Sequence, residues 1–293
     1  MMAHIRRTIR AVAALALAAA IGIGVATPAA AAPCTSDCLA PGDYNERLVV
    51  GGVERTYAVH VPASYRGGTA VPLLLDLHGY TSDIAQQRFL SGQLRQSDLR
   101  GFIVVWPQGL NRSWNAYGCC GASLAGGVDD VGFLRTLVST LKRRSNIDDA
   151  RVYVTGLSNG GSMTHRLACE AADVFRAAAP VSFTLNREAA ACRPSRPIPV
   201  VAFHGTSDVL VQYYGGLLFQ SAPRSRDAWG QVDGCTGTPV VTPLRLGSRS
   251  EIFTNCRGGV RTGLVTILGG GHILYPNVSV DIAQYIWTNV FNQ

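Results

Sequence analysis

The chain has 293 residues, of which 47% are hydrophobic and only 15% are charged. This composition excludes an intrinsically disordered chain and predicts a globular domain with a substantial core. The formal net charge is +7, and the three arginines among the first ten residues account for +3 of it, which leaves +4 (7 − 3). A nucleic-acid-binding role is excluded because there is no basic stripe; the one cluster, Lys142 to Arg144, ends a predicted helix.

The first 31 residues have the layout of a secretory signal peptide. Three arginines precede an apolar run of small residues over 11–25, and Ala29-Ala30-Ala31 then provides a cleavage pattern. A membrane anchor is the alternative, but the run is short and alanine-rich for a span. The proline before the first cysteine argues against a lipidated cysteine. We therefore predict a secreted, extracellular protein without stable membrane insertion, with a signal peptide at 1–31 and one folded domain at 32–293.

The rest of the chain alternates short buried strands with amphipathic helices. Residues 48–61 alternate in polarity around Gly51-Gly52, which predicts a β-hairpin. Later apolar runs predict buried strands, and apolar residues three to four positions apart predict helices. The strands are expected at 72–77, 101–106, 151–155, 177–183, 198–203 and 260–268, and the helices at 84–98, 129–144, 160–172 and 281–291. This order predicts an α/β fold in which a mostly parallel central sheet is flanked by helices.

Two adjacent acids, Asp129 and Asp130, open the predicted helix at 129–144. We interpret them as acids that favour a helix amino terminus, rather than as an acid/base pair.

Eight cysteines follow the signal segment. An even number in an exported chain predicts disulfides, and the spacing lacks the second close pair of a zinc site, so no metal is expected. Neighbours in sequence are expected to pair where the loop is short. The candidates are Cys169 with Cys192 and Cys235 with Cys256, which leaves Cys34 and Cys38 to be joined to the vicinal Cys119 and Cys120.

A nucleophile motif lies between a strand and a helix. Gly156-Leu157-Ser158-Asn159-Gly160 fits G-x-S-x-G, and it directly follows the strand that ends at Thr155. This is the strand–turn–helix setting in which a nucleophilic serine is lifted out of a sheet. The turn is so tight that the flanking positions must be small, which explains the two glycines.

Two partners follow Ser158 in the order typical of α/β-hydrolases, Ser…Asp…His. Asp208 lies just after the strand at 198–203, whereas the alternative acids, Asp227 and Asp233, fall in a predicted surface helix or at its end. His272 follows the strand at 260–268 and is the only histidine after the candidate acid. A serine hydroxyl needs a neutral imidazole to take its proton, and a carboxylate to orient that imidazole. The rate of ester hydrolysis should therefore fall as His272 becomes protonated.

Backbone N–H groups must stabilise the tetrahedral oxyanion. One donor should be Asn159, the residue after the nucleophile. The second should come from His78-Gly79-Tyr80 at the end of the strand at 72–77, with Tyr80 favoured and Thr81 as the competitor.

At this point the residues resemble a known family. The segments Trp114…Cys119-Cys120-Gly121, Val128–Phe133, Arg151–Gly161, Ala168-Cys169-Glu170 and His204–Asp208 are similar to those of polyhydroxybutyrate depolymerase-like esterases. That group also holds feruloyl and acetylxylan esterases, and the resemblance covers nearly the whole chain after the signal. It implies an α/β-hydrolase esterase domain with Ser158, Asp208 and His272 as the triad and Tyr80 and Asn159 at the oxyanion positions.

The resemblance implies an ester substrate, either a polyhydroxyalkanoate or a feruloyl or acetyl ester of plant cell walls, and no cofactor. The family often follows its catalytic histidine with Thr-Trp-Pro, whereas this chain reads His272-Ile-Leu-Tyr-Pro276, a departure that weakens the expectation of a polymer substrate. No separate substrate-binding module is expected after the catalytic domain, which favours a soluble or plant-derived ester. A secreted acyltransferase of the mycolyltransferase-like type is the alternative, and a binding protein without catalysis is a third. The oligomeric state cannot be read from the sequence.

Overall fold

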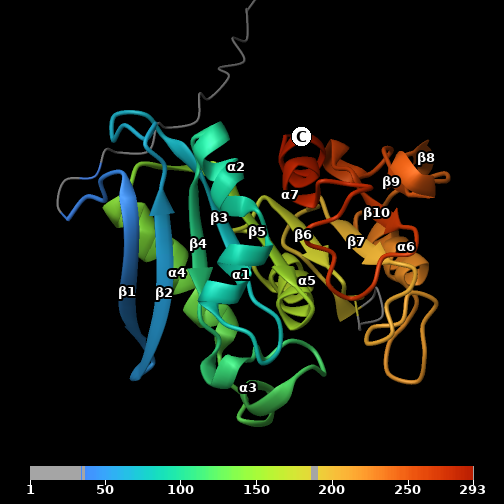
Figure 1. Cartoon of the computed structure of the whole chain (residues 1–293), viewed down its shortest axis with the longest axis horizontal. Helices are drawn as coiled ribbons and strands as arrows, with labels where there is room; N and C mark the ends of the chain where they lie inside the picture. The colour runs from blue at the N-terminus through green and yellow to red at the C-terminus, as the bar shows by residue number, and fades with distance from the viewer. Residues whose placement is uncertain (1–33, 35–36, 186–190, 293) are drawn as a thin grey trace, which may run out of the picture.

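A ten-stranded sheet, counted over the described residues 34, 37–185 and 191–292, forms the centre of this computed structural model (Figure 1). The strands are β1 (Gly42–Val50), β2 (Val53–Val61), β3 (Val71–Leu77), β4 (Ile103–Pro107), β5 (Ile147–Leu157), β6 (Ala177–Val181), β7 (Val201–Gly205), β8 (Val240–Pro243), β9 (Arg249–Phe253) and β10 (Thr262–Ile267). Their order in the sheet is β1-β2-β4-β3-β5-β6-β7-β10-β9-β8.

The six central strands run parallel to one another, and an antiparallel pair closes each edge. At one edge, the predicted hairpin forms β1 and β2. At the other edge, β8 and β9 were not predicted. All four residues of β8 are exposed, and β9 has only two consecutive apolar residues, Ile252 and Phe253. The arrangement confirms the predicted α/β fold with a mostly parallel sheet.

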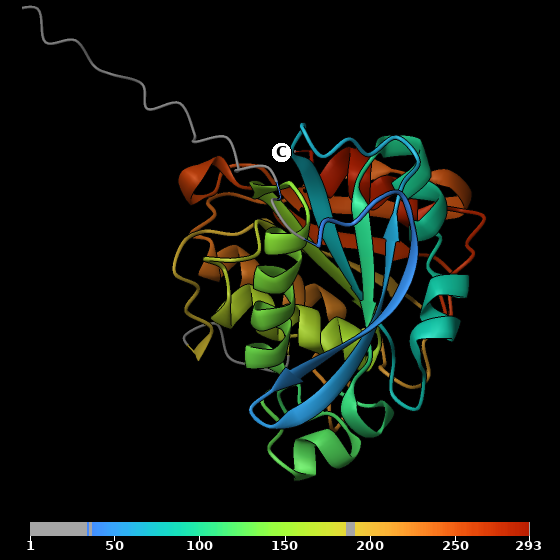
Figure 2. The same cartoon turned by 90° about the vertical axis from the view of Figure 1, so that its left-hand side faces the viewer.

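Helices cover both faces of the sheet, as the turned view in Figure 2 shows for α4 on one side and α1 and α2 on the other. α4 (Asp130–Arg144), α5 (Asn159–Glu170) and α6 (Ala222–Val232) pack on one face. α1 (Ile84–Leu90), α2 (Gln93–Arg100) and α7 (Ile282–Tyr285) pack on the other. The remaining helical pieces are α3 (Gly121–Ala125), the 3₁₀ turns Leu110–Arg112, Arg245–Gly247 and Arg257–Gly259, and the π-helical turn Ile286–Val290.

Local chemistry explains where α4 begins and which face it buries. The Asp129 side chain accepts a hydrogen bond from the Gly132 N–H at 2.8 Å, so this acid caps the helix as predicted. The apolar stripe from Phe133 to Leu141 is buried against the sheet. By contrast, the single helix expected over 281–291 is divided, because α7 continues as a π-helical turn.

The disulfides correct one part of the cysteine prediction. Cys169–Cys192 and Cys235–Cys256 form as expected. The other four cysteines do not join the amino terminus to the vicinal pair. Instead Cys34 bonds to Cys38, and Cys119 bonds to Cys120. Cys119 packs with Phe183 and Val211 in a small apolar cluster, so the vicinal pair belongs to the neighbourhood of β6 and β7.

The predicted signal segment, residues 1–31, lies outside the described residues. Among the helices that the structure describes, none combines the length and the apolar character needed to cross a bilayer.

Candidate active site

Ser158 lies on a strained turn between β5 and α5. Its φ of 57° and ψ of −118° fall outside the regions that a serine ordinarily adopts. Two glycines permit the turn: a Cβ on Gly156 would come within 2.6 Å of the Gly160 carbonyl oxygen, and one on Gly160 would come within 2.6 Å of the His78 carbonyl oxygen. The Ser158 N–H donates to the Val181 carbonyl at 2.9 Å, which ties the turn to β6.

The structure brings the three predicted side chains together. His272 Nε2 lies 2.8 Å from Ser158 Oγ, and His272 Nδ1 lies 2.8 Å from Asp208 Oδ2. Each residue follows a different parallel strand: β5 for the serine, β7 for the aspartate and β10 for the histidine. Side chains at the carboxyl ends of neighbouring parallel strands converge at one edge of the sheet, where α/β proteins place their sites.

Asp208 is buried and held in place by several donors. Its Oδ1 accepts from the N–H groups of Leu210 and Val211, each at 2.9 Å. His204 Nε2 lies 3.3 Å from Asp208 Oδ2 and 2.7 Å from the Val211 carbonyl oxygen. Burial alone would raise the pKa of Asp208, but hydrogen bonds from the two histidines and a backbone amide hold that pKa well below its usual value. The carboxylate is therefore ionised at neutral pH.

The alternative acids lie elsewhere. Asp227 pairs with its neighbour Arg226 on α6, and Asp233 is buried and accepts from the Ile198 N–H at 3.0 Å. Neither is a recorded partner of His272, which leaves Asp208 as the acid of this site.

Two backbone N–H groups close in sequence or space to Ser158 have no hydrogen-bond acceptor among the described residues. Asn159 is the first residue of α5, so its N–H has no acceptor within the helix. Tyr80 has no recorded acceptor for its N–H among the described residues, whereas the competitor Thr81 donates its N–H to the Arg112 carbonyl at 2.8 Å. The geometry thus favours Tyr80 over Thr81 as the second donor.

His78 fixes the loop that carries Tyr80. Its Nδ1 donates to the Gly79 carbonyl at 2.7 Å, and its Nε2 accepts from the Gly109 N–H at 2.9 Å. Burial lowers the pKa of His78 to about 4, so the ring is neutral at pH 7 and can both donate and accept.

A pocket of about 450 Å³ opens over the serine, a size within the usual range for small ligands, which is about 300–1,000 Å³. Its walls are mostly apolar and include Phe183, Val211, Phe219 and Ile273 together with the vicinal disulfide. Within the described residues, no group of three His, Cys, Asp or Glu side chains is arranged to hold a metal ion.

Comparison with known proteins supplies the family. A model of the family described as esterase PHB depolymerase matches residues 55–213, more than half of the 293 residues. The chain belongs to this family. The match includes Ser158 and Asp208, and His272 lies beyond it.

Individual relatives of this PHB depolymerase-family chain include two fungal proteins. Feruloyl esterase B of Piromyces equi is 35% identical over an alignment of 235 residues that covers 74% of this chain and 42% of the relative. A bifunctional acetylxylan esterase/xylanase of Neocallimastix patriciarum is 30% identical over 241 residues, 80% of this chain and 33% of the relative. The chain thus spans less than half the length of each.

A solved structure supports the fold assigned to this chain. The acetyl xylan esterase from Aspergillus awamori aligns with a TM-score of 0.57 at 15% identity, over 76% of this chain and 90% of the other. At this identity the likeness shows that the two chains share the α/β-hydrolase fold.

The side chain of Asn159 has a role in this family member that the sequence analysis missed. Its Oδ1 accepts from the Trp114 N–H at 2.7 Å, and its Nδ2 donates to the carbonyls of Trp114 and Cys119, each at 3.1 Å. The same residue therefore offers its backbone N–H beside the nucleophile and fixes the loop that carries the vicinal disulfide. In the sequence, the only indication of this side-chain role is that an asparagine precedes the second glycine of the G-x-S-x-G motif.

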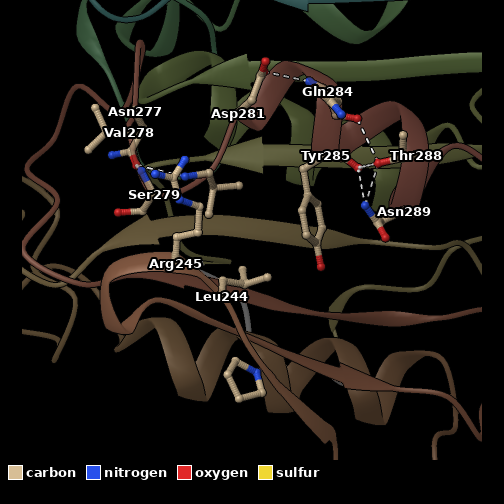
Figure 3. A pocket seen from close by; sticks show the side chains of 12 residues that line it. Leu244, Arg245, Asn277, Val278, Ser279, Asp281, Gln284, Tyr285, Thr288 and Asn289 are labelled. Carbon is tan, nitrogen blue, oxygen red and sulfur yellow. Dashed lines mark hydrogen bonds between the residues drawn. The ribbon is translucent and has the colours of Figure 1, made fainter.

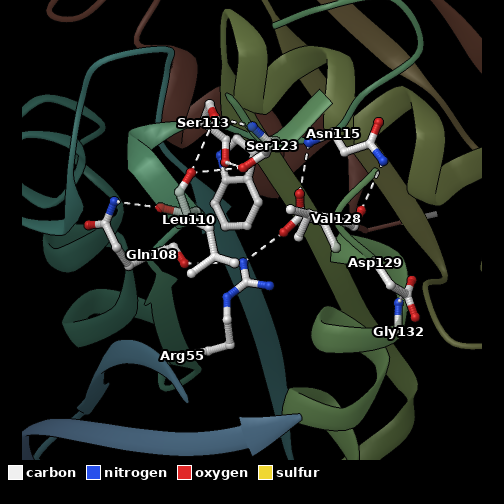
Figure 4. Close-up of polar contacts among 12 residues, drawn as sticks. Arg55, Gln108, Leu110, Ser113, Asn115, Ser123, Val128, Asp129 and Gly132 are labelled. Carbon is white, nitrogen blue, oxygen red and sulfur yellow. Dashed lines mark hydrogen bonds and ion pairs between the residues drawn. The ribbon is translucent and has the colours of Figure 1, made fainter. Parts of the chain in front are cut away.

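A buried ion pair braces the other end of that loop (Figure 4). Arg55 donates to Asp130 Oδ1 at 2.7 Å and lies 3.3 Å from the Gln108 carbonyl oxygen, and Asp130 Oδ2 accepts from the Asn115 N–H at 2.8 Å. Both charged side chains are almost fully buried. Asp130 is therefore more than the helix-terminal acid that the sequence predicted, because it also orients residues 108–115.

Proposed function

We propose that the protein is a secreted serine carboxylic-ester hydrolase in which Ser158, His272 and Asp208 form the catalytic triad. The observation that carries this proposal is the pair of 2.8 Å contacts that link serine to histidine and histidine to aspartate. The triad opens into a pocket that would admit the acyl part of an ester.

The reaction follows from these contacts. His272 Nε2 takes the proton as Ser158 Oγ attacks the ester carbonyl, and Asp208 stabilises the resulting imidazolium. The N–H groups of Tyr80 and Asn159 bind the oxyanion. Collapse of the tetrahedral intermediate expels the alcohol, which takes the proton from His272 and leaves an acyl-enzyme. A water molecule, deprotonated by the same imidazole, then attacks the acyl-enzyme and releases the acid.

The substrate that we favour is an ester of an aromatic acid on a plant cell-wall carbohydrate. The apolar pocket of about 450 Å³ is far larger than an acetyl group requires. Phe183 and Phe219, which pack edge to face at 5.3 Å, provide aromatic surface for a planar acyl group. Feruloyl and acetylxylan esterases among the relatives support this class, and a polyhydroxyalkanoate is the second candidate from the family.

Extracellular action is part of this proposal. The signal-like segment at 1–31, with the domain at 32–293, and four disulfides that persist in oxidising compartments support it.

Replacing the nucleophile tests the proposal. Ser158→Ala should lower kcat for methyl ferulate by on the order of 10⁴- to 10⁶-fold, because no hydroxyl remains to form the acyl-enzyme. A fluorophosphonate probe should label the wild-type protein and not the variant. The exposed Ser139 on α4 offers a matched control, and Ser139→Ala should hydrolyse and label normally. Turnover at the wild-type rate by the Ser158→Ala protein would contradict the mechanism. If the wild-type protein cleaved only poly(3-hydroxybutyrate) film and not methyl ferulate, the substrate would be the polyester instead.

A further inference from the structure

A second and larger cavity lies beside the C-terminal helix (Figure 3). It has a volume of about 1010 Å³ and none of the triad residues lines it. We call it the C-terminal cavity. Its walls come from three segments that are far apart in sequence: the turn after β8 with Arg245, the segment 277–281, and one face of the helical stretch 284–289.

A third, smaller hollow lies between this cavity and the active-site pocket and shares lining residues with both. This hollow, of about 210 Å³, shares Leu90 with the active-site pocket. The same hollow shares Asn277 and Asp281 with the C-terminal cavity. Hollows that share a lining residue are neighbours, which gives a long molecule seated at Ser158 a direction in which to extend toward the C-terminal cavity.

The character of the walls changes along this path. The active-site pocket is mostly apolar, whereas the lining of the C-terminal cavity includes side-chain amides and hydroxyls from Gln284, Asn289, Thr288 and Ser279. Thr288 and Asn289 also donate within the helical stretch, which fixes the orientation of their side chains. In Figure 3, Tyr285 extends from the helix toward Leu244, and it adds a ring and a hydroxyl to the wall. Such a mixture of donors, acceptors and one aromatic ring suits a polyhydroxylated ligand.

The charges in the cavity favour a neutral ligand. The lining holds one cation, Arg245, and one anion, Asp281. Arg245 is exposed, and although its carbonyl accepts from the Ser248 N–H, its guanidinium has no hydrogen bond or ion pair with the described residues and can donate to a ligand. Because these two charges balance, the lining has no net positive charge and does not favour a phosphate-rich ligand.

We propose that the C-terminal cavity binds the carbohydrate chain of an esterified polysaccharide, several sugar units away from the ester that Ser158 cleaves. This inference rests on the proposed esterase function and adds a site for the part of the substrate that does not react. A polyester carries ester oxygens that accept hydrogen bonds but no hydroxyl donors along its chain, so it would use only part of the donors and acceptors on this path.

A binding experiment tests the site without using activity. Xylohexaose is titrated into isotopically labelled Ser158→Ala protein, and the backbone amide NMR signals are followed. We expect shifts at 277–289. The double variant Arg245→Ala/Gln284→Ala in the same background should bind at least about fivefold more weakly, because two hydrogen-bonding side chains are lost. Shifts confined to the active-site pocket, or equal affinity in both proteins, would overturn the proposal.

Kinetics with an active protein separate this inference from the proposed function. In Arg245→Ala/Gln284→Ala, KM for feruloylated xylan should rise at least about fivefold. Turnover of methyl ferulate, which has no carbohydrate, should stay within about twofold, because the changed residues lie outside the active-site pocket. Arg143→Ala, on the exposed end of α4, is the matched control and should leave KM and kcat unchanged for both substrates. An unchanged KM for the polymer overturns the cavity's role and leaves the esterase intact, whereas failure of the wild type on every ester overturns the proposed function itself.

Discussion

At the scale of single residues, the environment of Asp208 explains how a carboxylate can remain charged in a buried site. Two backbone amides and two imidazoles donate to its oxygens or lie beside them. His204 Nδ1 has no hydrogen-bond partner among the described residues, so the N–H that its contacts require is on Nε2, where the Val211 carbonyl and Asp208 accept it. His204 therefore helps to orient the acid that orients His272.

Asp208→Asn should lower kcat for ester hydrolysis by on the order of 10⁴-fold, because an amide cannot stabilise the imidazolium and favours the wrong tautomer of His272. The two backbone amides can still donate to the asparagine carbonyl, so the fold should persist, and circular dichroism checks this. Asp227→Asn, which changes an acid on α6, serves as the control and should retain full activity. A loss of less than about tenfold in Asp208→Asn would contradict the assigned role.

At the scale of elements, the site depends on how closely α5 approaches the end of β3. Gly160 touches the backbone of this strand and of the loop that follows it, so the amino terminus of α5 and the loop of Tyr80 are set against each other. This contact sets the distance between the two segments that carry the candidate oxyanion donors, Tyr80 and Asn159. It also makes the elbow intolerant of even one methyl group.

Gly160→Ala should destabilise the protein by roughly 1–3 kcal/mol or more, since its Cβ would meet the backbone oxygens of Leu77 and His78. Urea unfolding measures the change in free energy of unfolding, and kcat should fall in parallel as the donors separate. Gly68→Ala is the comparison, because a Cβ there meets nothing within 4 Å. Equal stability of the two variants would show that the elbow can relax.

At the scale of the whole molecule, buried titratable groups link stability to pH. Burial lowers the pKa of His165 from 6.5 to about 3, and its ring accepts a hydrogen bond from Trp229 Nε1 at 2.9 Å. Burial also raises the pKa of Asp76 to about 6 and that of Asp233 to about 7. The two acids make stability fall as pH rises, and the histidine has the opposite effect.

The contribution of His165 can be isolated by comparison with His165→Gln. As pH falls below 6.5, the unfolded chain binds a proton at this position and the folded chain does not until about pH 3, so stability is lost on acidification. Between pH 7 and pH 5 the wild type should lose up to about 2 kcal/mol more than the variant. Urea unfolding at the two pH values measures this, and the two acids cancel in the comparison. Identical pH slopes would contradict a neutral buried imidazole.

The sequence predicted helices and strands with a regular apolar pattern, together with site residues that directly follow a strand. It missed contacts between side chains that are distant in sequence. Ser158, Asp208 and His272 could be found because each follows a buried apolar run. The Arg55–Asp130 pair joins residues 75 positions apart, and no local pattern records it. The role of the Asn159 side chain was missed because the sequence motif accounts for this residue through its backbone N–H alone. Strand β8 was missed because exposed strands lack an apolar period.

The disulfides follow a simple rule with a consequence for biosynthesis. Each cysteine pairs with the next one along the chain, at separations of 4, 1, 23 and 21 residues. A polypeptide that emerges into an oxidising compartment with its amino end first can therefore complete every bond before a competing thiol appears. Correct oxidation then needs no reshuffling between remote partners, and no crosslink ties the first half of the sheet to the second.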